Sequence, residues 1–147
     1  WSIASLAALM VALGGALAET LIAGWPRWLR PPDLIVPIPL HPRRRRQRGY
    51  NQSELLARPL AEAVGVAYSA TPLQRTRHTQ PQVGLGPQAR AVNVRGAFTA
   101  APDEARGRAI LLVDDVLTTG ATMTAAAEAL LAAGAASVSA YCLARVS

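Results

Sequence analysis

Lysine is absent from this 147-residue sequence, and cysteine and aromatic residues are rare. All 15 basic residues are therefore arginine, and the formal net charge is +6. One explanation for this bias is a genome rich in G and C. The other is phosphate binding, because the planar guanidinium group forms paired hydrogen bonds with phosphate oxygens. Both explanations stay open, and either is compatible with a polyanionic ligand or partner.

The single cysteine, Cys142, excludes a disulfide within the chain and a cysteine-based metal site. A reducing compartment is its simplest setting, so we expect a cytoplasmic protein. The first residue is Trp1 rather than Met, so we expect a segment upstream of it. An apolar content of 51% is enough to build a core, and we predict a single domain over residues 1–147.

An uncharged run covers residues 3–18, but it is shorter than the roughly 20 residues that a membrane-spanning helix needs. No basic segment precedes it, and Glu19 interrupts it. We predict instead a helix over residues 1–24 that packs on a sheet and does not enter a membrane. Its apolar stripe at helical spacing is Leu6, Met10, Leu13, Leu17 and Leu21. A membrane anchor or a signal peptide is the alternative.

Strand-like and helix-like segments alternate along the rest of the chain. We predict strands at residues 33–38, 66–68, 97–99, 109–113 and 138–143, and helices at residues 51–64 and 122–133. Asn51 and Glu54 have the spacing of a capping box. The arginine-rich residues 41–49 are predicted to be a loop, and residues 74–95 a mobile loop that closes over a binding site. The pattern predicts an α/β fold with a mostly parallel central sheet and helices on both faces.

Two acids and a phosphate cradle follow the predicted strand at residues 109–113. In open α/β sheets, ligands bind beyond the carboxyl ends of the strands. Asp114 and Asp115 are suited to accept hydrogen bonds from the vicinal hydroxyls of a ribose. The turn after them offers hydroxyls and backbone amides at a helix N terminus, where phosphate binds well: Thr118, Thr119, Gly120, Ala121 and Thr122. Taken singly, these residues are also typical of an ordinary turn and helix cap.

Together, residues 110–122 resemble the complete thirteen-residue phosphoribosyl pyrophosphate (PRPP) signature of type I phosphoribosyltransferases. They consist of four apolar residues, two acids, three spacers and then Thr-Gly-Ala-Thr. Four segments read in order also resemble the ComF family of competence-related, phosphoribosyltransferase-like proteins: VPIPLHP at 36–42, RGYNQ at 48–52, RAVNV at 90–94 and LVDDV at 112–116. The resemblance covers nearly the whole chain from Asp33 onward. The four-cysteine zinc ribbon that often begins these proteins has no counterpart here, so zinc binding is not carried over.

The resemblance implies a type I phosphoribosyltransferase-like fold and an enzyme that uses PRPP and Mg²⁺. An acceptor that the sequence does not define would displace pyrophosphate. Asp114 and Asp115 would orient the ribose and hold Mg²⁺ indirectly, through ribose or water. The pyrophosphate would contact Pro39, Leu40, Arg43, Arg46, Arg48 and Asn51. Residues expected to act from the mobile loop are Arg75, Gln82, Arg90 and Asn93. The expected catalytic residues are Asp114, Asp115, Arg75 and Arg90.

A non-catalytic module is the main alternative. It would bind PRPP or single-stranded DNA during natural transformation, and the family resemblance implies helicase-like or recombination partners. The arginines at residues 43–46 would then hold nucleic-acid phosphates, or else form only a solvated basic face. An aromatic content of 5% does not favour a base-stacking platform. The acceptor and the oligomeric state are not determined by the sequence.

Overall fold

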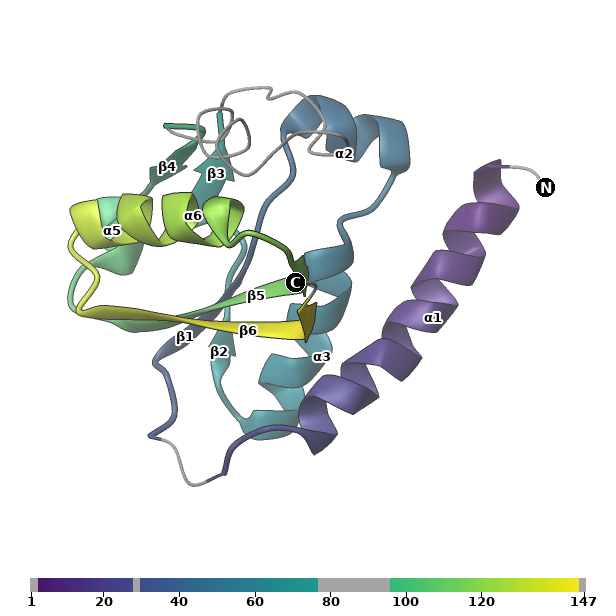
Figure 1. The fold of residues 1–147 in the computed structure, drawn as a ribbon, viewed down its shortest axis with the longest axis horizontal. Coiled ribbons are helices and arrows are strands. Elements are labelled where there is room, and N and C mark those ends of the chain that lie inside the picture. The colour runs from purple at the N-terminus through teal and green to yellow at the C-terminus, as the bar shows by residue number, and fades with distance from the viewer. Residues whose placement is uncertain (1–2, 28–29, 77–95, 146–147) are drawn as a thin grey trace.

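The centre of the molecule is a four-stranded parallel sheet (Figure 1). The computed structural model describes residues 3–27, 30–76 and 96–145, with the side chains of residues 3–12 left out. Across the sheet the strand order is β2 (Ala67–Tyr68), β1 (Leu34–Pro37), β5 (Ala109–Leu117) and β6 (Ser137–Arg145). All three pairings are parallel. This confirms the predicted α/β class and its parallel sheet.

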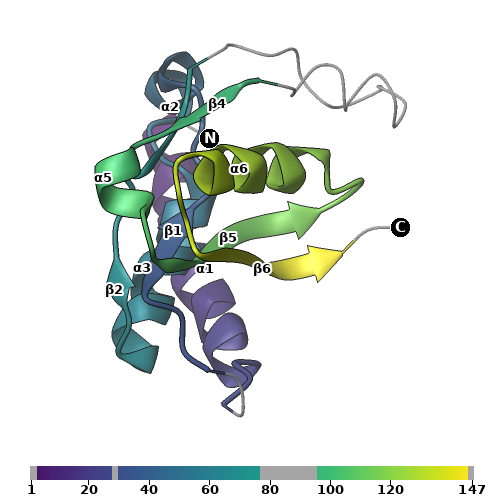
Figure 2. The ribbon, with the colours of Figure 1, turned by 90° about the vertical axis from the view of Figure 1, so that its left-hand side faces the viewer.

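Helices cover both faces of this sheet, as predicted (Figures 1 and 2). Side chains alternate between the two faces of a strand, so β5 supplies both halves of the core. Ile110 and Leu112 pack with α6 (Ala121–Ala132), whereas Leu111 and Val113 pack with α1 (Ile3–Ala23) and α3 (Gln52–Val64). Residues in the middle of β1 and β5 are almost completely buried. The core thus fixes where both strands end.

A second, two-stranded antiparallel sheet joins β3 (Leu73–Arg75) to β4 (Phe98–Ala100), and the short helix α5 (Pro102–Ala105) follows. The segment predicted as a mobile loop therefore starts later than expected, because Gln74 and Arg75 belong to β3. Their partners are Thr99 and Phe98, too far along the chain for a local pattern to indicate the pairing. The predicted loop residues Gln82, Arg90 and Asn93 lie outside the described residues.

The prediction of a loop at residues 41–49 is wrong, because the arginine-rich segment forms a helix, α2 (Pro42–Arg48). The imidazole Nδ1 of His41 accepts a hydrogen bond from the backbone N–H of Arg43, at 3.1 Å. Pro42 occupies the first turn, where its missing N–H costs nothing, and arginine favours helices. Gly49 ends the helix with a φ of +80°, a conformation that favours glycine.

The predicted capping box at the start of α3 does not form. Asn51 does cap the helix, but its side chain accepts from the N–H of Ser53, at 3.2 Å. Glu54 instead forms an ion pair with Arg45. The Glu54 carboxylate therefore links α3 to α2 and does not accept the backbone N–H of Asn51, as a capping box requires.

Helix α1 packs through only part of the predicted stripe. Leu21 is buried and Leu17 packs against the core beside Ala18, whereas Leu13 is 45% exposed. A Cβ added to Gly14 would lie 3.2 Å from the Cβ of Leu55, so this glycine allows α1 and α3 to approach closely. The N-terminal end of α1 stands apart from the rest of the ribbon (Figure 1). In the part of the chain that the structure describes, no helix has the length and apolar character to cross a membrane.

Candidate ribose-phosphate site

The two acids lie at the carboxyl end of β5, beside the end of β1. Strand β5 continues past Val113 to Leu117, so Asp114 and Asp115 are strand residues. The N–H of Ile38 donates to the carbonyl of Val113 at 2.9 Å, which holds the chain after β1 next to the acids. The local pattern did not predict this longer strand. The pairing of Asp114 with Cys142 and of Leu117 with Arg145 shows that β6 extends it.

A hollow of about 150 Å³ opens beside these acids. It is lined by Ile38, Pro39, Leu40, Arg48, Asn51, Gln52, Ser53, Arg75, Asp114, Asp115 and Thr122. Eight of these lining residues were predicted from the sequence: Pro39, Leu40, Arg48, Asn51, Arg75, Asp114, Asp115 and Thr122. A neighbouring hollow of about 360 Å³ shares Pro39, Leu40 and Arg75 with it. The two hollows therefore adjoin each other.

The predicted phosphate cradle forms the turn into α6. Gly120 precedes the helix with a φ of +81°, and its carbonyl accepts from the N–H of Thr124 at 2.8 Å. The N–H of Ala121 donates to the hydroxyl of Thr119 at 3.3 Å. Thr122 in the first turn of α6 lines the hollow, but Thr118, Thr119, Gly120 and Ala121 do not. The N terminus of α6, which favours anions, thus adjoins the acids.

Asp114 is mostly buried, and its pKa is raised to about 7. Desolvation is the largest cause, and the adjacent carboxylate of Asp115 adds to it. Its Oδ1 accepts from the hydroxyl of Ser53 at 3.0 Å and from the N–H of Asp115 at 2.9 Å. These donors favour the ionised form and partly offset the rise. Near neutral pH, the group is therefore poised between an acid and a carboxylate.

Two arginines place positive charge in the same hollow. Arg75 is only 7% exposed, and its guanidinium carbon lies 5.2 Å from the centre of the Phe98 ring. Arg48, at the end of α2, is exposed. The hollow therefore combines acids, which suit hydroxyls or a cation, with arginines, which suit phosphate. By contrast, the predicted Arg43 and Arg46 do not line it.

Ser53 and Gln52 line the hollow but were not predicted as site residues. Ser53 donates to Asp114, which lies 61 positions away in the sequence. The only local signal was its place in the first turn of a helix that follows the arginine-rich segment. A contact over that separation becomes visible only when β5 and α3 are placed together.

The described residues contain no cluster of three or more histidine, cysteine or acidic side chains that would hold a metal ion alone. Asp114 and Asp115 offer two carboxylates. Mg²⁺ commonly binds through one or two carboxylates together with water and substrate phosphates. The residues present therefore fit a Mg²⁺ ion that arrives with a phosphorylated ligand.

A larger hollow of about 460 Å³ lies at the opposite, amino end of the sheet. The rings of Trp25 and Tyr141 contribute to its lining, with their centres 5.6 Å apart. Its charged lining residues are Arg30 and Asp33. Among the described residues it has no adjacent acids and no helix N terminus, so its chemistry suits a ribose phosphate less well than the smaller hollow does.

Comparison with known sequences agrees with this geometry. Residues 51–147 match the family of the phosphoribosyl transferase domain. The DNA utilization protein YhgH of Salmonella typhimurium is 41% identical over 129 residues, covering 88% of this chain and 56% of that protein. Competence protein F of Haemophilus influenzae is 35% identical, covering 80% of this chain and 52% of that protein. Competence protein ComFC of Bacillus subtilis is 39% identical, covering 76% of this chain and 44% of that protein.

Among solved structures, the fold resembles glutamine PRPP amidotransferase from B. subtilis, with a TM-score of 0.59 and 22% identity. The match covers 86% of this chain and 25% of that one. The chain belongs to the phosphoribosyl transferase domain family. The two competence proteins among its relatives also confirm the predicted resemblance to the ComF family. The chain spans about half the length of the curated relatives it matches.

Proposed function

We propose that this chain binds PRPP together with Mg²⁺ and is a phosphoribosyltransferase, in which an acceptor displaces pyrophosphate from C1 of the ribose. One observation carries the proposal. Two adjacent acids, two arginines and the N terminus of α6 meet around a single hollow at the carboxyl end of the sheet. Few ligands need a diol-binding acid pair and phosphate-binding groups side by side. A phosphorylated ribose is one of them.

Each part of the site has a role in this proposal. Asp114 and Asp115 orient the ribose through its hydroxyls. The turn at Thr118, Thr119, Gly120, Ala121 and Thr122, of which Thr122 lines the hollow and the others lie beside it, holds the 5-phosphate. Pro39, Leu40, Arg48 and Arg75 face the pyrophosphate, which extends from the smaller hollow into the neighbouring one. Preorganised positive charge stabilises a departing pyrophosphate. Bound Mg²⁺ would be held by ligand oxygens and, indirectly through ribose or water, by the two acids, and it would neutralise further charge on the leaving group.

Calorimetric titration of PRPP, with and without Mg²⁺, tests the proposal. The variant is Asp114→Asn/Asp115→Asn, which removes both carboxylates while keeping their size. A matched control is Asp103→Asn/Glu104→Gln, an adjacent acid pair on α5, outside the two hollows. We expect Mg²⁺-dependent binding by the wild type and the control, and loss of binding by the site variant. A folded wild type that does not bind PRPP would contradict the proposal.

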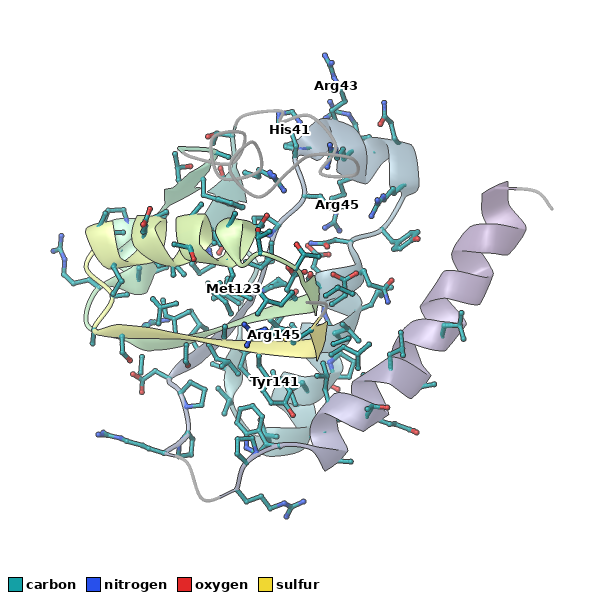
Figure 3. The ribbon with its side chains drawn as sticks, viewed as in Figure 1. His41, Arg43, Arg45, Met123, Tyr141 and Arg145 are labelled. Atoms are coloured by element: carbon teal, nitrogen blue, oxygen red, sulfur yellow. The ribbon has the colours of Figure 1, made fainter. Side chains whose placement is uncertain are left out.

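Single-stranded DNA binding is a second candidate function, favoured by the surface of α2. Arg43, Arg46 and Arg48 are exposed on this helix, whereas Arg45 is paired with Glu54. Arg43 projects outward from the helix (Figure 3). The exposed guanidinium groups of α2, of which that of Arg48 lines the hollow, would hold a phosphate backbone. In this proposal the chain acts in the cytoplasm, with helicase-like or recombination proteins as partners.

The salt dependence of binding tests this second function. We would titrate labelled oligothymidylate at several salt concentrations, comparing the wild type with Arg43→Gln/Arg46→Gln. The control, Arg106→Gln/Arg108→Gln, removes two exposed arginines located before β5, away from α2. Loss of two phosphate contacts should reduce the slope of log K against log salt by about 1.4. Equal slopes in all three proteins would refute the role of α2.

A further inference from the structure

Buried polar side chains are few among the described residues, and two of them lie close together in the sequence. They are Asn51, Ser53 and Arg75, with exposed fractions of 4%, 3% and 7%. Asn51 and Ser53 both lie at the start of α3, between the ends of β1 and β5. A buried polar group that lacks a partner is costly, so its contacts indicate why it is there.

The contacts of this pair connect three elements. The Nδ2 of Asn51 donates to the carbonyl of Ile38, at 3.1 Å, directly after β1. Its Oδ1 accepts from the N–H of Ser53, at 3.2 Å. The hydroxyl of Ser53 then donates to Oδ1 of Asp114, at 3.0 Å, at the end of β5. The pair therefore links the loop that carries Pro39 and Leu40 to one of the two acids.

Helix capping alone does not explain this arrangement. A cap needs only a side-chain oxygen, and serine or aspartate would supply it as well as asparagine. The amide donor of Asn51 and the hydroxyl of Ser53 are additional features, and each is directed at a part of the candidate site. The oxygen of Asp114 that Ser53 contacts also receives the N–H of Asp115, so two donors fix the rotation of this carboxylate.

We infer that Asn51 and Ser53 are positioning residues, with Ser53 orienting the Asp114 carboxylate toward the ribose hydroxyls and Asn51 holding the loop after β1 against the pyrophosphate. The inference rests on the proposed function and deepens it, because it assigns one residue to each half of PRPP. Neither residue needs to touch the reacting atoms. Each acts through a group that does.

The discrimination between ribose 5-phosphate and 2-deoxyribose 5-phosphate isolates the role of Ser53. Both sugars would be measured as competitors of PRPP in the presence of Mg²⁺. The wild type should prefer the ribose form, because only that form offers the 2-hydroxyl to the acids. General destabilisation weakens both competitors equally and leaves their ratio unchanged. Misorientation of Asp114 lowers the ratio.

Ser53→Ala should reduce the preference for ribose by about tenfold, which corresponds to a lost hydrogen bond to a charged group. Ser139→Ala, an identical change at an exposed position on β6, should keep the preference of the wild type. Thermal unfolding of each variant would confirm that it is folded. An unchanged preference in folded Ser53→Ala would overturn the role of Ser53, while the proposed function would stand.

Asn51→Ser tests the role proposed for Asn51 at the pyrophosphate. This change keeps a capping oxygen but removes the donor to the Ile38 carbonyl. We expect weaker binding of pyrophosphate and PRPP, with the ribose preference of the wild type retained. Unchanged affinity for both ligands would overturn the role of Asn51. A wild type that fails to bind PRPP, or binds it without preferring the ribose competitor, would overturn the proposed function together with this inference.

Discussion

The two ends of the parallel sheet differ in both size and chemistry. At the amino end lies the larger hollow, of about 460 Å³, walled partly by the Trp25 and Tyr141 rings. At the carboxyl end lies a hollow of about 150 Å³, with two acids, two arginines and a helix N terminus around it. The smaller hollow is the candidate site because acids, arginines and a helix N terminus converge on it, whereas the larger hollow is distinguished only by its volume.

The direction of the strands explains this asymmetry. Because the four strands are parallel, every segment that leaves a strand starts at the same end of the sheet. The loop after β1 and the turn after β5 therefore meet there, and α3 follows α2 into the same region. The amino end collects the segments that enter the strands. These include the prolines before β1, which serve to redirect the chain.

The largest expected effect concerns Asp114, because a buried acid at the carboxyl end should lower stability in the free protein. Its folded pKa of about 7 exceeds the ordinary value of 3.8 for an aspartate, so the folded state binds the proton more tightly. Stability from this group is complete below about pH 4 and is lost as the pH rises toward and through 7. Asp114→Asn cannot ionise. It should be more stable than the wild type at pH 8 by an amount that shrinks toward pH 4.

Urea denaturation of the Mg²⁺-free proteins at pH 4, 6 and 8 would measure this difference. Asp103→Asn, an exposed acid on α5, is the control and should show no comparable trend. The same stability difference between Asp114→Asn and the wild type at all three pH values would contradict a raised pKa for Asp114.

An effect of intermediate size is expected on PRPP affinity, which should depend on the arginine at the carboxyl end of the sheet and not on the one at the amino end. Arg48 lines the carboxyl-end hollow, whereas Arg106 lies just before β5, near the amino end of the sheet. Arg48→Gln should weaken PRPP binding about tenfold, since a hydrogen bond to a charged group is lost. Arg106→Gln carries the same charge change and should not affect PRPP affinity. Equal losses in both variants would indicate that only net charge attracts the ligand.

The smallest effect should come from the amino end. The hydroxyl of Tyr141 donates to the carbonyl of Leu21 at 2.7 Å and so fastens β6 to α1. Tyr141→Phe should reduce the free energy of unfolding by about 1 kcal/mol. PRPP affinity, measured by the same calorimetry, should stay at the wild-type value. A loss of PRPP affinity in this variant would show that the amino end also contributes to ligand binding.

Regular, strongly apolar segments were predictable because their signals are local. The strand at residues 109–113 and the acids after it followed from burial pattern and motif alone. Helix α2 was missed because four consecutive arginines suggested a solvated loop. Pro42 at its start and Gly49 at its end were the signals that should have indicated a helix. A charge run does not by itself exclude regular structure.

Interactions between distant segments were not predictable in the same way. The pairing of β3 with β4 joins Arg75 to Phe98, and the buried hydroxyl of Ser53 contacts Asp114. Neither contact can be predicted from the spacing of residues nearby in the sequence. The eight predicted residues that line the hollow were identified from motifs. That they converge on one hollow follows from the order of the strands, which the motifs do not give.

The register between β1 and β5 also has a consequence for folding kinetics. Leu34 pairs with Ile110, and Asp33 accepts from the N–H of Ala109 at 2.8 Å, so the central strands join segments that are far apart in the chain. Closing so long a loop costs entropy before any pairing repays it. We therefore expect folding in roughly milliseconds to seconds, typical of non-local topologies. The candidate site cannot form earlier than this central pairing, so ligand binding would report the completion of folding.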